Sequence, residues 1–172
     1  IDPLAIPMVR NHMDEKISEV DKNSVGTMDM DIILDAFMNK LRQITGKSVD
    51  KVISTPIAIV ISKGDIKTLS PFIGEEEISD YMIKHELSMD SYMDVQDKII
   101  RQFLNDNGMA GFVNNIDLKF KNNRYFICSA IGHTREAGHY NPKGVLEPME
   151  WIFQKADPAM KNAWNEHKFG NN

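Results

Sequence analysis

Residues 114–143 read NNIDLKFKNNRYFICSAIGHTREAGHYNPK, and the predicted sheet depends mostly on this stretch. Apolar and polar residues alternate over 116–120, IDLKF, which is typical of a strand with one solvated face. The asparagine pair at 122–123 tolerates the left-handed backbone of a tight turn. Residues 125–131, YFICSAI, form a second predicted strand that is apolar on both faces and therefore covered on both sides. The pattern predicts a β-hairpin.

A polar loop follows the second predicted strand, at residues 132–144. Its internal glycines and its Asn-Pro-Lys-Gly exit indicate a loop rather than a helix. Loops that leave the end of a buried strand often carry function, because the strand fixes one of their ends. The loop's titratable side chains are His133, Arg135, Glu136, His139, Tyr140 and Lys143. We therefore expect this loop to be the functional part of the chain.

Two imidazoles and a carboxylate in the loop suggest a metal site. His133, Glu136 and His139 are of types that bind zinc, and three protein ligands with one open position make a catalytic centre. Their spacing, His-x2-Glu-x2-His, matches no established zinc signature, and on a regular helix the three would spread over about 120°. A metal-dependent hydrolase centred on these residues, with a divalent ion such as zinc, is therefore an alternative hypothesis.

The leading hypothesis is a non-enzymatic binding or assembly module, an accessory component of a larger protein complex that needs no cofactor. The sequence has no complete catalytic constellation: it lacks a Gly-x-Ser-x-Gly elbow, and Cys128 lies within the predicted strand. The predicted contact surface is residues 114–144 with the aromatic C-terminal helices. Its partner- or anion-binding side chains are Arg135, His139, Tyr140, Lys143, Trp151 and Trp164. A second alternative is a small-ligand sensor whose loop closes an apolar pocket.

The chain has 172 residues, 42 % hydrophobic and 26 % charged, which predicts one domain, residues 1–172, with a helical part over about 1–46. Its net charge of −5 argues against a nucleic-acid surface. Residues 75–98 hold eight acids against two lysines, whereas residues 117–143 hold five bases against two acids. This segregation indicates either two solvated faces or a protein partner or anionic group that meets the hairpin and loop.

The single cysteine, Cys128, excludes an internal disulfide and fits a reducing compartment, so a soluble, cytoplasmic protein is favoured. A removed N-terminal signal or anchor stays open, because the chain begins at Ile1 rather than Met. No run of 18 apolar residues occurs, so no membrane-spanning segment is expected in this chain. The 11 methionines indicate adaptable core packing or a soft groove for a partner helix.

Helical periodicity predicts helices over residues 3–21, 28–45, 74–87 and 88–104, with two more that begin near Glu147 and Asp157. Gly46 and the Asn-Asp-Asn-Gly run at 105–108 are predicted to end two of them. Residues 57–61, IAIVI, form a predicted buried strand. We therefore predict an α+β fold in which helical pairs pack on a small, mostly antiparallel sheet of three or four strands.

Overall fold

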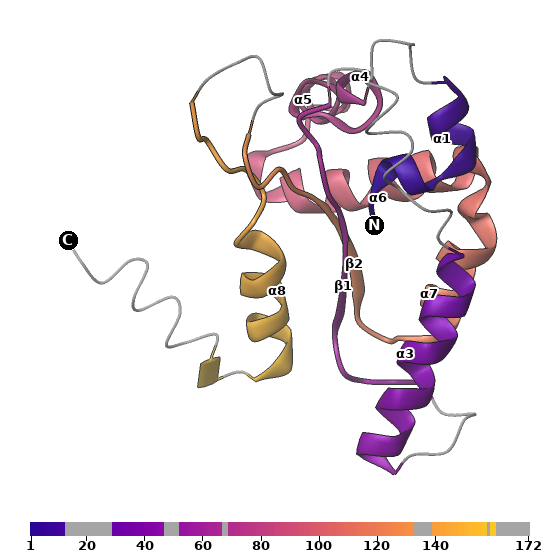
Figure 1. The fold of residues 1–172 in the computed structure, drawn as a ribbon. Coiled ribbons are helices and arrows are strands. Elements are labelled where there is room, and N and C mark those ends of the chain that lie inside the picture. Colours follow the sequence, from indigo (N-terminus) through magenta and orange to yellow (C-terminus); the bar gives the residue numbers. More distant parts are fainter. Residues whose placement is uncertain (13–28, 47–51, 67–68, 133–138, 158, 161–172) are drawn as a thin grey trace.

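The structure is a computed structural model that describes residues 1–12, 29–46, 52–66, 69–132, 139–157 and 159–160. Figure 1 shows its elements in chain order. The α-helices are α1 (Pro7–His12), α3 (Met30–Thr45), α4 (Ser70–Ile73), α5 (Glu75–Lys84), α6 (Tyr92–Leu104), α7 (Ala110–Lys119) and α8 (Glu147–Ala156). Shorter helical turns are η1 (Pro3–Ala5), η2 (Met89–Ser91) and η3 (Asn105–Met109), and the strands are β1 (Ile57–Ile61) and β2 (Asn123–Ile127).

The two strands form a parallel pair, with Ile57 opposite Asn123 and Ile61 opposite Ile127. The mixture of helices and strands confirms an α+β fold in broad terms. The prediction of three or four mostly antiparallel strands is wrong, since the sheet of the described residues has two strands and they are parallel. Parallel strands need a long crossover connection, and the helices α4 to α7 supply it between the end of β1 and the start of β2.

The predicted β-hairpin is wrong because α7 occupies the place of its first strand. Ile116 is 1 % exposed and Phe120 is 2 % exposed, but Leu118, which the alternation put on the same face, is 74 % exposed. The buried residues Phe112, Val113, Ile116 and Phe120 recur at the spacing of one helix face. Residues 116–120 fit both the alternation of a strand and the spacing of a helix face. Burial of the helix face against the rest of the core favours the helix.

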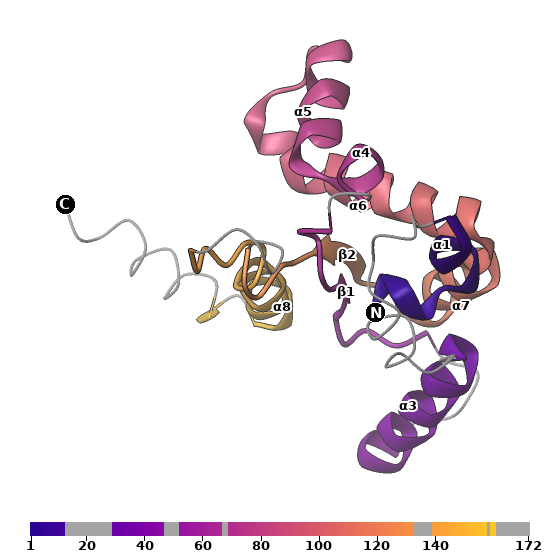
Figure 2. The ribbon, with the colours of Figure 1, turned by 45° about the horizontal axis from the view of Figure 1, so that its top comes forward.

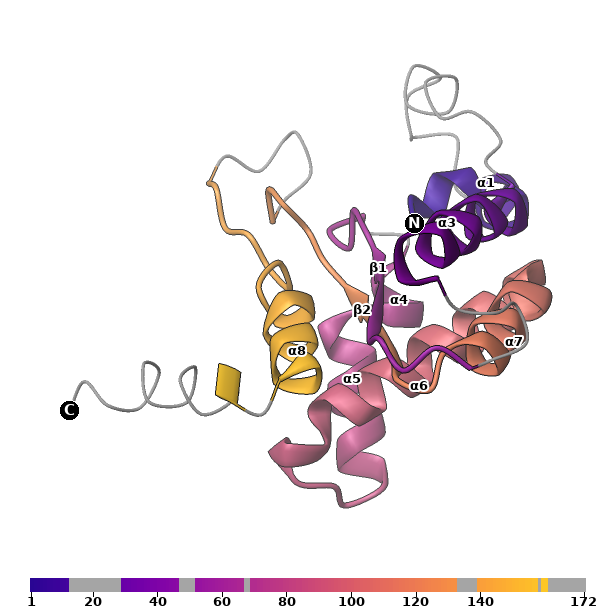
Figure 3. The same ribbon diagram turned by 90° about the horizontal axis from the view of Figure 1, so that it is seen from below.

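β2 is covered on both faces, as predicted for its apolar residues, but it spans Asn123–Ile127 rather than the predicted 125–131, and Ile131 is 55 % exposed. Tyr125 and Phe126 are 0 % exposed and, as neighbours in a strand, point to opposite faces. The Arg101 guanidinium of α6 lies 4.4 Å from the Tyr125 ring centre, and Trp151 of α8 meets Phe126 edge-on at 6.0 Å. Figures 1 and 3 show α8 on one side of the strands and α3 and α7 on the other.

The C-terminal end of α3 lies where the sequence predicted it, before Gly46, whereas its first residue, Met30, comes two residues after the predicted start. The Asp29 carboxylate caps its first turn, accepting hydrogen bonds from the backbone N–H groups of Asp31 at 3.0 Å and Ile32 at 3.3 Å. Gly46 follows the helix with a φ of 63°, and its N–H donates to the carbonyl of Arg42. Local capping chemistry therefore fixes both ends of this helix.

The break after α6 is also confirmed, although the helix α7 comes directly after it in place of the predicted strand. Asn107 and Gly108 have non-helical backbone angles, and Gly108 has a φ of 81°. A Cβ atom on Gly108 would lie 2.9 Å from the Met8 sulfur, so glycine suits this turn on both counts. The kink lets α1 pack beside the junction of α6 and α7 (Figure 2).

Two predictions on chain organisation fall partly outside the described residues. The helix predicted over 3–21 is described as η1 and α1, and residues 13–21 lie outside the described part. The single-domain organisation of residues 1–172 stays a prediction. Among the described helices, none has the length and apolar character needed to cross a membrane.

Candidate functional site

The predicted functional loop is described only in part. His133, Arg135 and Glu136 lie outside the described residues, as does Trp164. His139 and Tyr140 are described, and both side chains are exposed, Tyr140 to 78 %. Their roles in binding stay predictions.

A short antiparallel ladder holds the two ends of this loop together. The N–H of Ser129 donates to the carbonyl of Lys143 at 2.8 Å, and the reverse bond measures 2.9 Å. The N–H of Asn141 donates to the carbonyl of Ile131 at 2.9 Å. Gly132 has a φ of 81°, and a Cβ there would lie 1.6 Å from the Asn141 carbonyl oxygen. Glycine is therefore required where the loop leaves the ladder.

Two of the predicted contact residues already interact within the chain. Lys143 forms an ion pair with Glu75 of α5, with 2.8 Å between Nζ and Oε2. Trp151 is 6 % exposed and packs on Phe126, so its indole belongs to the core rather than to an open surface. Lys143 joins the loop to α5, whereas Trp151 joins α8 to the sheet.

The metal hypothesis finds no support in the described residues. Among them, no group of three or more His, Cys, Asp or Glu side chains is arranged to hold a metal ion. Of the three predicted ligands, only His139 is described, and it is exposed. A site built from His133, Glu136 and His139 stays a prediction.

A cavity of about 630 Å³ lies at the carboxyl ends of the two parallel strands. Ligands of open sheets that contain parallel strands commonly bind at this edge. Ser129 lines this cavity, and its hydroxyl donates to Asp65 Oδ1 at 2.5 Å and accepts a hydrogen bond from the Gly132 N–H at 2.8 Å. Ser129 therefore links Asp65 to the backbone at Gly132, where the loop begins.

The cavity's thiol is not activated. Burial raises the pKa of Cys128, the nearby carboxylates of Asp65 and Glu147 raise it further, and the positive chain terminus opposes them. Burial, with Glu75 and Glu147, also raises the pKa of Tyr92. A thiol reacts as its thiolate, so a raised pKa weakens Cys128 as a nucleophile at neutral pH.

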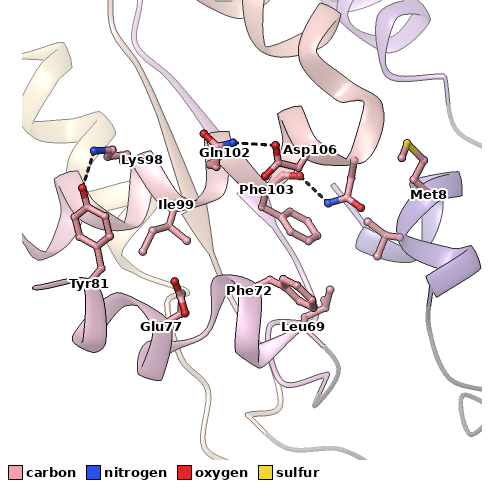
Figure 4. Close-up of a pocket in the computed structure, with 12 residues that line it drawn as sticks. Met8, Leu69, Phe72, Glu77, Tyr81, Lys98, Ile99, Gln102, Phe103 and Asp106 are labelled. Atoms are coloured by element: carbon pink, nitrogen blue, oxygen red, sulfur yellow. Dashed lines mark hydrogen bonds between the residues drawn. The ribbon is translucent and has the colours of Figure 1, made fainter. Parts of the chain in front are cut away.

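A second hollow, a groove of about 700 Å³, lies between α1, α4, α5 and α6 (Figure 4). Its floor is apolar and consists of Met8, Val9, Leu69, Phe72, Ile99 and Phe103. Phe72 and Phe103 lie with their ring centres 6.5 Å apart, and Phe72 is 61 % exposed. Met8, at one end of the groove, is 44 % exposed.

Polar side chains form the rim of this groove. Lys98 Nζ donates to the Tyr81 hydroxyl at 2.6 Å and lies 5.0 Å from the centre of the Tyr81 ring. Gln102 Nε2 donates to Asp106 Oδ1 at 2.8 Å. Figure 4 shows both pairs, with Glu77 on the opposite wall from Gln102. An apolar floor with a few ordered polar groups is the usual composition of a binding site.

No residue of the groove was predicted as a site residue; the methionine content indicated either core packing or a soft groove, and one methionine, Met8, lines this groove. Ile99 and Phe103 lie one helical turn apart on the apolar face of α6, which the sequence indicates only as a core-facing surface. The groove exists because α1, α4 and α5 converge on that face from separate parts of the chain. Comparisons of the chain with protein-family models, curated proteins and solved structures found no match.

Proposed function

We propose that the protein is a non-enzymatic binding module that holds an apolar helical segment of a partner protein in the groove of Figure 4. The observation that carries this proposal is the groove, a hollow of about 700 Å³ whose apolar floor includes the exposed ring of Phe72. Scattered apolar side chains are common on protein surfaces, but several that line one hollow are typical of an interaction site. The weakened Cys128 thiol favours binding over nucleophilic catalysis.

The length of the groove suits about two turns of helix. Lys98 and Asp106 both line the groove, and the eight residues of helix from one to the other span about 12 Å. An amphipathic partner helix presents anchors at positions i, i+4 and i+7 over about 10 Å. Met8 supports this occupant, because its unbranched thioether adapts to partner side chains of different shape.

The rim favours a partner that carries a positive charge beside its apolar face. Glu77 and Asp106 supply two carboxylates, and the rim cation Lys98 already donates to Tyr81. A lysine or arginine on the partner would pair with Glu77, which forms no ion pair with another of the described residues. Such rim charges contribute more to orientation and association rate than to affinity.

The surface predicted from the sequence supports a second contact of the same module. Large apolar side chains are exposed around the loop base and the start of α8, namely Ile131, Tyr140, Val145, Leu146 and Met149. We propose that this surface, with Arg135 and Trp164, contributes to assembly in a larger complex.

Site-specific photo-crosslinking in the native cells tests the groove. A photoreactive phenylalanine analogue at Phe72 should give one discrete protein adduct, because that ring lies on the groove floor. The matched control is the same analogue at Ile83 of α5, which is 75 % exposed and lies outside the groove. Adding Phe103→Asp to the Phe72 probe should remove the adduct. Identical adducts at Phe72 and Ile83, or none at either, would contradict the proposal.

The groove's volume also supports the small-ligand sensor as a second candidate, because ligand pockets typically measure about 300–1,000 Å³. A sensor would show a melting temperature that rises with one metabolite, since a ligand of the native state stabilises it. That result, together with no protein adduct at Phe72, would favour the sensor over the protein-binding module.

A further inference from the structure

The connections that leave the two parallel strands lie on opposite faces of the sheet. The connection from β1 includes α6, which packs on the Tyr125 side of β2, where the Arg101 guanidinium lies 4.4 Å from the Tyr125 ring centre. The connection from β2 leads into α8, which packs on the other side, with the rings of Trp151 and Phe126 6.0 Å apart. In open sheets that contain parallel strands, ligands bind where such connections diverge, in the crevice outside the carboxyl ends of the strands. The strand ends in Figure 1 are therefore the place in this fold where a ligand is expected.

The cavity of about 630 Å³ occupies this crevice, and both connections line it. Its polar lining includes Asp65, Tyr92 and Gln96 from the connection after β1, and Ser129, Lys143 and Glu147 from the connection after β2. Gln96 is 8 % exposed, and the side chains of Asp65 and Glu147 are half-buried. The cavity is separate from the groove of Figure 4, because no residue lines both.

Negative charge predominates in the lining of this cavity. Its charged side chains are one ammonium group, that of Lys143, and four carboxylates, those of Asp65, Glu75, Glu76 and Glu147. Lys143 Nζ lies 2.8 Å from Glu75 Oε2, so this cation is already paired. The other three carboxylates form no ion pair with another of the described residues. A negatively charged ligand would be repelled here, whereas a positively charged ligand would be attracted.

Glu147, the first residue of α8, acts on two walls of the cavity. Burial raises the pKa of Cys128 after β2 and the pKa of Tyr92 on α6, and the Glu147 carboxylate raises both further. The side chain of Gln96, one turn along α6, is hydrogen-bonded to the Tyr92 hydroxyl. Carboxylate, amide and phenol oxygens all accept hydrogen bonds from an ammonium group. The acceptors of α6 and α8 therefore suit a cation that can donate hydrogen bonds.

We propose that this cavity binds a small aliphatic amine, with an ammonium group beside the Glu147 carboxylate and the hydrocarbon chain against Met93 and Ile127, which also line the cavity. The volume lies within the range of about 300–1,000 Å³ that is typical of small-ligand pockets. Hydrogen bonds from an ammonium group to a carboxylate are about twice as strong as neutral ones, which favours an amine over an alcohol. This site goes beyond the proposed function and does not depend on it, because the groove lies elsewhere.

Isothermal titration of the full chain with putrescine, an aliphatic diamine, tests the charge requirement. We expect one saturable site with a Kd below about 1 mM, and no saturable binding of butanediol, the neutral diol of the same length. Glu147→Gln should raise the Kd by about tenfold or more, because it removes a charge-assisted hydrogen bond. The matched control Asp90→Asn removes the same charge from an exposed residue of η2, outside the cavity, and should leave the Kd within about twofold. No binding of putrescine, equal binding of butanediol, or equal weakening by both substitutions overturns the proposal.

The methionine methyl signals in nuclear magnetic resonance locate the bound amine. Met93 lines the cavity, whereas Met8 lines the groove. In protein that is isotopically labelled at the methionine methyl groups, putrescine should shift the Met93 signal and leave the Met8 signal in place. Met93→Leu and Met8→Leu assign the two signals by their disappearance. A shift of the Met8 signal with the Met93 signal unmoved would place the amine in the groove and overturn the proposal.

Discussion

Ile116 and Leu118 lie two residues apart in α7 and have opposite environments. Ile116 is 1 % exposed and Leu118 is 74 % exposed. A strand would put both side chains on one face, whereas a helix turns them about 200° apart. Replacing each in turn by alanine therefore asks whether residues 110–119 are helical in solution.

The two alanine substitutions should differ strongly in the unfolding free energy that they remove. Ile116→Ala removes three buried carbons, worth about 2.4 kcal/mol at about 0.8 kcal/mol each, and leaves a cavity, so we expect a loss of about 3 kcal/mol of unfolding free energy. Leu118→Ala removes mostly solvated atoms and introduces the best helix former, so we expect a change within about 0.5 kcal/mol of zero.

Urea unfolding followed by far-ultraviolet circular dichroism measures both changes. With a slope of about 1–3 kcal/mol per molar urea, Ile116→Ala should lower the midpoint by about 1–3 M at unchanged slope, and Leu118→Ala should leave it nearly unchanged. Ile83→Ala, at a residue that is 75 % exposed on α5, gives the baseline for an exposed apolar residue. Equal losses for Ile116→Ala and Leu118→Ala would refute the helical assignment and restore the hairpin.

Three further predictions concern α6, β2 and Cys128, the residue that follows β2. Arg101→Leu should lower the unfolding free energy by about 2–3 kcal/mol, because it leaves the partly buried Asp97 carboxylate, 2.7 Å from Nε, without its cation. Asp97→Asn should lower it by less, and a larger loss for Asp97→Asn than for Arg101→Leu in urea unfolding would contradict this account. Tyr125→Phe should keep or raise stability by up to about 1 kcal/mol, because the buried hydroxyl has no hydrogen-bond partner among the described residues; a clear loss on thermal unfolding would refute this. Alkylation of Cys128 should reach half its maximal rate at a higher pH than alkylation of a free thiol. Glu147→Gln should lower that pH, since Glu147 helps raise the pKa of the thiol. An unchanged pH of half-maximal rate in Glu147→Gln would contradict this role of Glu147.

The candidate sites differ in how far the sequence predicts them. The loop after β2 was predicted from its residue types, but the pairing of its two ends at Ser129 and Lys143 was not predicted and comes from the structure. The groove was not located, because Phe72 and Ile99 lie on separate helices whose apolar faces each indicate only burial. Exposed apolar residues such as Phe72 become recognisable as a site only once the packing of neighbouring helices is known.

The sequence by itself determined the features that depend on a few neighbouring residues. The Asp29 cap, the left-handed Gly46 after α3 and the Gly108 break after α6 follow from local backbone and capping preferences. The tertiary structure alone decided that residues 116–119 are helical, because Ile116 and Phe120 fit both a strand face and a helix face. It also decided that β1 and β2 pair in parallel and that four helices enclose the groove. Those outcomes depend on which distant surfaces bury one another, and no local pattern contains that information.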